Sequence, residues 1–365
     1  MRAVSRIVLL GTIVTVLCAP AKAGEREPAK PAFCLAYPRG VLPTFEQAIA
    51  ERPNDTSVVV APDGKRVAIN DPHGRVVSWK AQPGADPILF ASGGVVQALT
   101  AHGGLFVRSA GALVRVDVAT GRVTSTFSGM RLPLKVTAAR VDGSGRSLVI
   151  SRTSTSEGEL SILDDCELSR EKCPGRGFTP RGRRLAEGWS LVTAVMKKSL
   201  TNGRLVGNEV VAVEEEDNAL TTENPDATNV GPVVVLGVED GVEHRRWKSK
   251  YRYLRLSDGG VAQWNERAAD VLVSDLSTGK ELKRLTVQKK PGEQIRSVNA
   301  TSGKLVVETV VGDTRGAPAV WRIYDANGGR LEATFSKPIG GVAIAPDGGA
   351  VVADDKGVCW YGRSP

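Results

Sequence analysis

VAIAPDGGAVVA, at residues 342–353, places a Pro-Asp-Gly turn between two short runs of small and β-branched apolar residues. The same arrangement occurs near the other end of the chain as SVVVAPDGKRVAI, at residues 57–69. Asp and Gly tolerate the positive φ angles of a tight hairpin turn, and branched apolar residues favour strands. Both stretches therefore predict β-hairpins, and weaker copies of the turn occur at 141–145 and 256–260.

A second recurring pattern is an apolar strand, a turn that begins with Asp, and a further strand that ends on a large apolar residue. It occurs at 114–122, 272–280 and 322–330, in a degenerate form at 234–241, and the strands that follow end on Phe127, Leu285, Phe335 and Trp247, respectively. Asp117, Asp275 and Asp325 occupy the same position in each copy. This repetition indicates that they form turns, because an Asp side chain can accept hydrogen bonds from the backbone just after it, and it argues against a catalytic role for any one of them.

The two patterns alternate, and one full unit takes about 40–50 residues, which is the period of a four-stranded propeller blade. Seven units can be placed, at 53–91, 95–130, 134–180, 190–247, 252–286, 295–336 and 340–363. The sequence therefore predicts an all-β fold, a β-propeller of seven four-stranded blades over residues 53–365, with six or eight blades as alternatives. An acidic and polar loop insertion at about 212–229, which contains the block Glu214 to Asp217, is expected to lengthen the fourth unit.

This pattern resembles the WD40-like and TolB-like propeller families, in which a Pro-Asp-Gly turn and an Asp-x-x-x-Gly turn mark each blade. The resemblance covers roughly residues 53–363. The Trp-Asp dipeptide of true WD40 repeats is absent. The resemblance therefore implies the architecture and not that family's function.

The last unit ends soon after its third strand, at 357–361, and so lacks a fourth. The N-terminal segment, 24–52, contains an unassigned apolar strand at 32–37, which can supply the missing outer strand and remove an open sheet edge. That arrangement places Cys34 beside Cys359, and directly opposed residues on neighbouring strands are close enough for a disulfide. We therefore expect a covalent clasp between Cys34 and Cys359, and a local disulfide between Cys166 and Cys173, with other pairings as the alternative.

Residues 1–23 read as a secretory signal peptide. Arg2 and Arg6 precede an apolar run at 7–17, and Ala21-Lys22-Ala23 is a small-x-small cleavage signal. The run is shorter than the roughly 20 apolar residues of a membrane-spanning helix, so no transmembrane anchor is expected after cleavage. An exported protein, periplasmic or secreted, is expected to form disulfides. Its net charge of +8 is small for 365 residues, and we expect no nucleic-acid partner.

Catalytic motifs are scarce. His73, His102 and His244 lie far apart and lack the spacing of a zinc site. No nucleophile elbow or nucleotide-binding glycine loop is present in the sequence. We assign no catalytic residue, no metal site and no cofactor from the sequence.

One segment, residues 244–255, interleaves cations with aromatic residues. If it forms one strand, alternate side chains share a face, so Arg246, Lys248, Lys250 and Arg252 would line one face. The aromatic side chains would lie on the opposite face. The candidate binding residues are Arg245, Arg246, Trp247, Lys248, Lys250, Tyr251, Arg252 and Tyr253. An anion-binding face is one interpretation. The other is an outer strand whose aromatic residues pack between blades while its cations are solvated.

These observations favour a binding scaffold, an exported propeller whose loops engage another protein or an envelope component. The alternative is a periplasmic propeller enzyme or enzyme subunit. Exported propellers that resemble lactonases and the large subunits of quinoprotein amine dehydrogenases make it plausible by analogy. Their active sites are assembled from several blades. Titratable side chains that converge on the central channel would favour the enzyme.

Overall fold

The structure is a computed structural model, and every element in its described part is a β-strand. The described residues are 30–38, 58–70, 76–90, 95–100, 103–109, 112–127, 135–141, 147–152, 158–163, 182–185, 189–192, 200–215, 228–237, 242–301, 303–312, 319–336, 339–354 and 356–362. The predicted signal peptide and the Cys166 and Cys173 pair lie outside these ranges.

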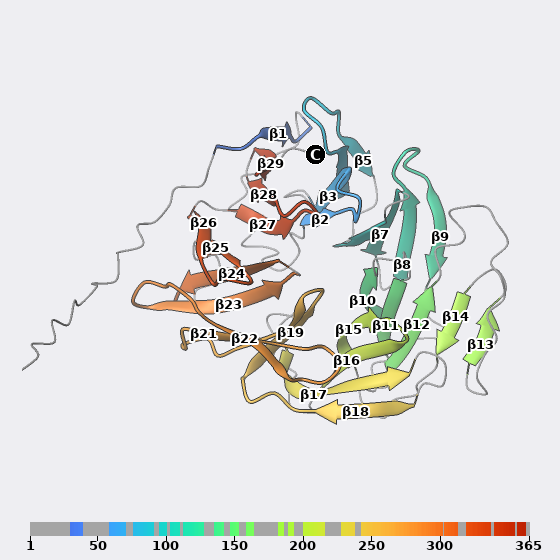
Figure 1. Ribbon diagram of the computed structural model, residues 1–365. Coiled ribbons are helices and arrows are strands. Elements are labelled where there is room, and N and C mark those ends of the chain that lie inside the picture. The colour runs from blue at the N-terminus through green and yellow to red at the C-terminus, as the bar shows by residue number, and fades with distance from the viewer. Residues whose placement is uncertain are drawn as a thin grey trace, which may run out of the picture.

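Consecutive strands pair in antiparallel fashion, and the resulting units follow one another around a ring (Figure 1). Unit one contains β2 (Val58–Val60), β3 (Arg66–Asn70), β4 (Val76–Lys80) and β5 (Ile88–Phe90). Unit two contains β6 (Val95–Leu99), β7 (Gly104–Ser109), β8 (Ala112–Asp117) and β9 (Val123–Phe127). Unit three contains β10 (Lys135–Val141), β11 (Ser147–Arg152), β12 (Gly158–Leu163), β13 (Gly182–Leu185) and β14 (Trp189–Val192).

The second half of the ring repeats the arrangement. Unit four contains β15 (Leu200–Val206), β16 (Glu209–Glu215), β17 (Thr228–Gly237) and β18 (Glu243–Trp247). Unit five contains β19 (Tyr253–Ser257), β20 (Gly260–Trp264), β21 (Asp270–Ser274) and β22 (Glu281–Thr286). Unit six contains β23 (Glu293–Ala300), β24 (Lys304–Val311), β25 (Ala319–Asp325) and β26 (Leu331–Phe335). Unit seven contains β27 (Ile339–Ile344), β28 (Ala350–Asp354), β29 (Gly357–Tyr361) and, from the other end of the chain, β1 (Phe33–Ala36).

The predicted propeller class is confirmed, but the described strands form six separate hydrogen-bonded sheets and not the seven blades that were predicted. Units four and five form one eight-stranded sheet. Strand β17 is 10 residues long, and Thr228 and Asn229 at its start pair with β19 of unit five. The excess length of one strand therefore joins two repeat units that the sequence predicted to be separate.

Two boundaries also differ from the expected ones. Unit three extends to Val192, because β14 pairs with β12 and carries β13 as a fifth strand. The expected polar insertion at about 212–229 is shorter than predicted, because β16 continues to Glu215 and β17 begins at Thr228. Glu214 is buried in β16 and does not belong to a loop.

The hydrophobic core lies between neighbouring units. Middle strands such as β20 and β28 are buried at nearly every residue, because each sheet is covered on both faces. Five clusters of buried residues span the described junctions, and each joins two consecutive units. At the junction of units seven and one, for example, Trp360 and Val351 pack with Trp79 and Val67.

A recurring contact explains why the outer strands end on a large apolar residue. The ring of Trp247, which ends β18, lies on Gly279 in the turn of unit five, and Leu285 of unit five lies on Gly329 of unit six. Phe335 of unit six makes an edge-on ring contact with Tyr361 of unit seven, with 5.0 Å between ring centres. The apolar residue of the second sequence pattern thus packs against the next unit.

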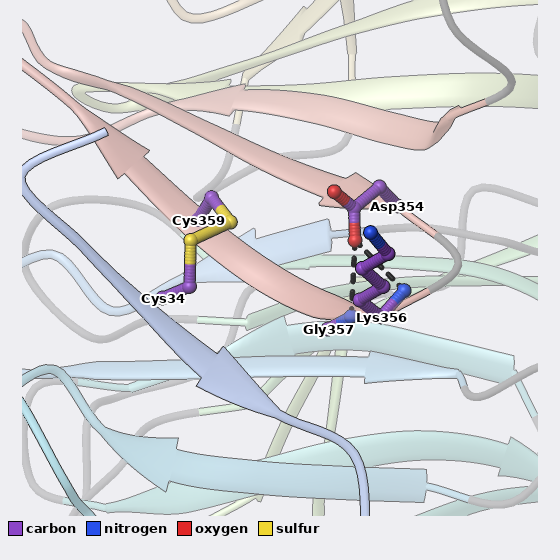
Figure 2. Close-up of a disulfide and its surroundings, with 5 residues drawn as sticks. All are labelled: Cys34, Asp354, Lys356, Gly357 and Cys359. Atoms are coloured by element: carbon purple, nitrogen blue, oxygen red, sulfur yellow. Dashed lines mark hydrogen bonds between the residues drawn. A yellow bond between two sulfur atoms is a disulfide. The ribbon is translucent and has the colours of Figure 1, made fainter. Parts of the chain in front are cut away.

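The ring closes as the sequence predicted. Strand β1 pairs with β29, Cys34 lies opposite Cys359, and the two form a disulfide with their Cα atoms 4.1 Å apart (Figure 2). The ring of Phe33 stacks on Trp360 at 5.2 Å. Asp354 accepts hydrogen bonds from the backbone N–H groups of Lys356 and Gly357 in the turn that leads into β29. The closing unit is therefore held together by the pairing of β1 with β29, by an aromatic stack and by a disulfide bond.

Candidate functional site

The basic and aromatic segment that the sequence singled out does not form one strand. Strand β18 ends at Trp247 and β19 begins at Tyr253, so residues 248–252 form a link between units four and five. The predicted single row of Arg246, Lys248, Lys250 and Arg252 is therefore wrong, because side chains alternate regularly only within a strand.

Trp247 belongs to the junction of the two units. Its side chain packs at the edge of the cluster that contains Val233 and Leu254. It also covers Gly279. The absence of a side chain on this glycine makes room for the indole ring, because a Cβ at that position would lie 2.6 Å from it. The interpretation that aromatic residues of this segment pack between blades is confirmed for Trp247.

The charge of Arg246 is compensated by two carboxylates. Its guanidinium donates to both carboxylate oxygens of Glu214 at 2.6 and 2.9 Å, and also to both of Glu243, the closest at 2.6 Å. These hydrogen bonds raise the pKa of Arg246, and Arg246 lowers the pKa of Glu243. Arg245 and His244 lie 3.7 and 3.6 Å from Glu209. Strand β18 is thus an exposed edge strand whose arginines are largely engaged, and charged side chains protect such an edge from pairing with other chains.

The link at 248–252 is bonded to side chains of unit five. Ser249 donates to Gln263 at 2.6 Å, and the backbone N–H of Arg252 donates to Asn265 at 2.8 Å. The hydroxyl of Tyr251 donates to Asp270 at 2.9 Å. Burial is the largest cause that raises the pKa of Tyr251, and the bond to Asp270 adds to it. These bonds hold the link in one conformation.

Tyr253 is also engaged within the fold. Its ring stacks on Trp264, with 5.8 Å between ring centres, and its hydroxyl bonds to Glu266. The guanidinium of Arg252 lies over the Tyr253 ring at 5.4 Å and within 3.8 Å of Glu266. Tyr251 and Tyr253 therefore support the link and are not presented for stacking with a ligand.

Two further links lie at the same end of the ring. In an antiparallel meander the connection from the second to the third strand and the connection to the next unit share one end. Residues 265–269 and 287–292 are those connections in unit five. The Lys289 ammonium donates to the carbonyl oxygens of Arg267 and Glu293 at 2.6 and 3.2 Å, which ties these two links together.

These three links carry a concentration of positive charge. They contain one acid, Glu266, and six cations: Lys248, Lys250, Arg252, Arg267, Lys289 and Lys290. We call these six residues the loop-end patch. All are exposed except Lys289, which is half-buried. In the described part of the chain, neither Lys250 nor Arg267 takes part in an ion pair.

Sequence reasoning found half of this patch and missed Arg267, Lys289 and Lys290. The sequence does indicate that Lys289 and Lys290 lie in a connecting loop, because they precede Pro291 and Gly292 at a unit boundary. Their proximity to Arg267 depends on the meander, which brings the two connections to one end.

The described connections at the opposite end of the ring include three tight turns that begin with an Asp. Asp275 accepts hydrogen bonds from the backbone N–H and the hydroxyl of Thr278 at 2.8 and 2.7 Å. Asp117 and Asp325 accept from backbone N–H groups of their own turns. These bonds lower the pKa of all three carboxyls. Their predicted role as turn-formers is confirmed.

Unit six contains a buried ion pair. Arg322 donates to Glu293 at 2.8 Å and to Thr309 at 2.6 Å, and the side chains of both Arg322 and Glu293 are at most 5% exposed. Every partner comes from the same sheet, so the pair links β23, β24 and β25 within the unit. Its position inside the sheet indicates a structural role.

Other candidate chemistry is limited in the described part of the chain. His73 and His102 lie outside it, and His244 lies on β18. The described residues include no group of three or more His, Cys, Asp or Glu side chains placed to hold a metal ion. Across the same residues, no helix has the length and hydropathy needed to cross a membrane.

The comparisons with known proteins match the fold. No family model and no curated protein matches the sequence. Among solved structures, the chain is similar to the WD40 β-propeller domain of Doa1, with a TM-score of 0.52 and 13% identity over 85% of this chain and 94% of that one. It is also similar to a chain of the mitotic checkpoint complex, with a TM-score of 0.55 and 12% identity over 96% of this chain and 100% of that one. The architecture is therefore a WD40-like propeller.

Proposed function

We propose that this chain is an exported propeller, periplasmic or secreted, that acts as an interaction scaffold for a protein or an envelope component. The observation that carries the proposal is the contrast between the two ends of unit five. One end is closed by tight, internally bonded turns. The other presents three links that are held by hydrogen bonds and in which five of the six cations are exposed. Rigid links on a scaffold are a common place for binding residues.

The placement outside the cytoplasm is supported by the signal-like residues 1–23 and by the Cys34–Cys359 disulfide, since such bonds persist in oxidising compartments. Mass spectrometry of the protein purified from cells tests this part. We expect a chain that begins at Gly24 and is recovered outside the cytoplasm, and a full-length cytoplasmic chain would contradict it.

The scaffold function is tested by co-purification from the compartment where the protein is found. The wild-type chain is compared with the loop-end variant, Lys250→Glu/Arg267→Glu, and with the control Arg122→Glu/Lys280→Glu. The control reverses the charge of one Arg and one Lys in the turns that begin with Asp117 and Asp275, at the opposite end of the ring. We expect a stoichiometric protein partner with the wild type and the control, and its loss with the loop-end variant. A partner retained equally by all three would contradict a role for the loop end.

A further inference from the structure

We infer that the loop-end patch binds an acidic segment of a protein partner, an inference that rests on the proposed scaffold function and names the chemistry of its ligand. The patch carries more positive than negative charge. Glu266, the one acid in the three links, lies within 3.8 Å of Arg252 and is already bonded to Tyr253, and in the described part of the chain neither Lys250 nor Arg267 takes part in an ion pair. The positive charge of the patch therefore exceeds what its own carboxylate compensates.

The backbone that carries the patch is preorganised. The link that carries Lys250 is held by Ser249 and Tyr251, and the ammonium of Lys289 is held by two backbone carbonyls. Because these backbones are already ordered, binding costs less conformational entropy than it would on a loose loop. The patch thus combines a backbone held by hydrogen bonds with the exposed side chains of Lys250 and Arg267.

The arrangement of the cations favours one kind of anion. The cations come from three separate links and five of the six are exposed, whereas a site for a small anion needs donors that converge on one point. Insertion into a lipid surface needs exposed apolar side chains, and none of the exposed large hydrophobic residues in the described part lies in the three links. One of them, Val311, lies opposite Glu293 at the edge of the patch and is 56% exposed. A spread of cations beside one apolar side chain fits a peptide segment with several carboxylates and an apolar residue.

The test is direct binding of a fluorescently labelled peptide of eight glutamates to the full chain, measured by anisotropy at low salt, with a peptide of eight glutamines as the neutral control. We expect binding to the glutamate peptide that weakens as salt is added, because exposed charges are screened. Lys250→Glu/Arg267→Glu is expected to weaken it about tenfold, and Arg122→Glu/Lys280→Glu to leave it within about twofold. Neither Lys250 nor Arg267 takes part in an ion pair in the described chain, so the loop-end variant breaks no such pair of the fold.

Competing ligands are measured in parallel: inorganic phosphate, phosphatidylglycerol vesicles and an oligothymidylate of the same charge. Equal or tighter binding of any of these, at the same loop-end residues, would overturn the assignment to a protein segment. Peptide binding that is unchanged in the loop-end variant would overturn the site. If a partner co-purifies through the loop end but the glutamate peptide does not bind, the scaffold proposal stands and the acidic-segment inference fails. If the peptide binds as expected but no partner depends on the loop end, the scaffold proposal is the part that fails.

Discussion

The contact between Trp247 and Gly279 gives a quantitative prediction about how neighbouring units are held together. Gly279 has a φ of +68°, and a Cβ there would lie 2.6 Å from the Trp247 ring. Gly279→Ala therefore has two costs. The left-handed backbone costs an L-residue about 1–2 kcal/mol, and the overlap with the ring costs about 1–3 kcal/mol more.

The chain contains matched controls that separate the two costs. Gly207 has a φ of +59° with nothing within 4 Å of the added methyl, and Gly121 has a φ of +70° with Phe90 at 4.0 Å. Alanine at either position should cost the backbone part alone, about 1–2 kcal/mol. Gly329, with Leu285 at 3.0 Å, should fall between these controls and Gly279→Ala.

The assay is urea unfolding of the four single variants, followed by Trp fluorescence, with circular dichroism as the second probe because large repeat folds need not unfold in one step. The double variant Gly279→Ala/Trp247→Ala isolates the overlap. Removing the ring should make the alanine less costly by about 1–3 kcal/mol, a non-additive result typical of residues in contact. If Gly279→Ala costs no more than Gly207→Ala and Gly121→Ala, the reasoning about packing on the turn glycine is refuted.

Three further predictions concern other parts of the ring. Replacing Cys34 and Cys359 by Ser should lower the free energy of unfolding by up to about 5 kcal/mol, because the bond closes a very long loop; an unchanged urea midpoint without reductant would contradict this. Arg322→Met should destabilise by about 3–5 kcal/mol by leaving Glu293 buried and unpaired, and adding Glu293→Gln should recover most of that loss in the same assay. Asp275→Ala should cost about 1 kcal/mol at pH 7. Because the folded pKa of Asp275 is lowered, its contribution is present above the unfolded pKa of about 3.9 and is lost as the pH falls through the folded pKa, so the cost should shrink in unfolding curves at pH 3 and below.

Much of the fold was predictable because its determinants are local. A hairpin needs only two short apolar runs and a turn that accepts positive φ, and both are visible at 57–69 and 342–353. The turn role of Asp275 follows from hydrogen bonds to Thr278, three residues away. Even the Cys34–Cys359 bond was predictable. The last unit has only three strands of its own, and the N-terminal strand belongs to no other unit, so pairing the two places Cys34 beside Cys359.

The number of sheets was not predictable in the same way. It depends on whether β17 is long enough for Thr228 and Asn229 to reach β19, and nothing in the repeat pattern specifies the length of one strand. The partners of Arg246 were also hidden. Glu214 is 32 residues away and reads as part of a polar insertion, and only the register of β16 and β17 brings it beside β18.

The sequence by itself determined the elements of this protein: short strands, tight Asp and Gly turns, a repeated unit and a closing strand. It did so because turn chemistry and strand periodicity act over a few residues. Only the tertiary structure decided which cations are compensated and which face solvent. It buried Glu214 against Arg246, separated Arg246 from Lys250, and brought Arg267 and Lys289 to the same end of the ring. Electrostatic compensation depends on distances between residues far apart in the chain, and those distances exist only once the units have packed.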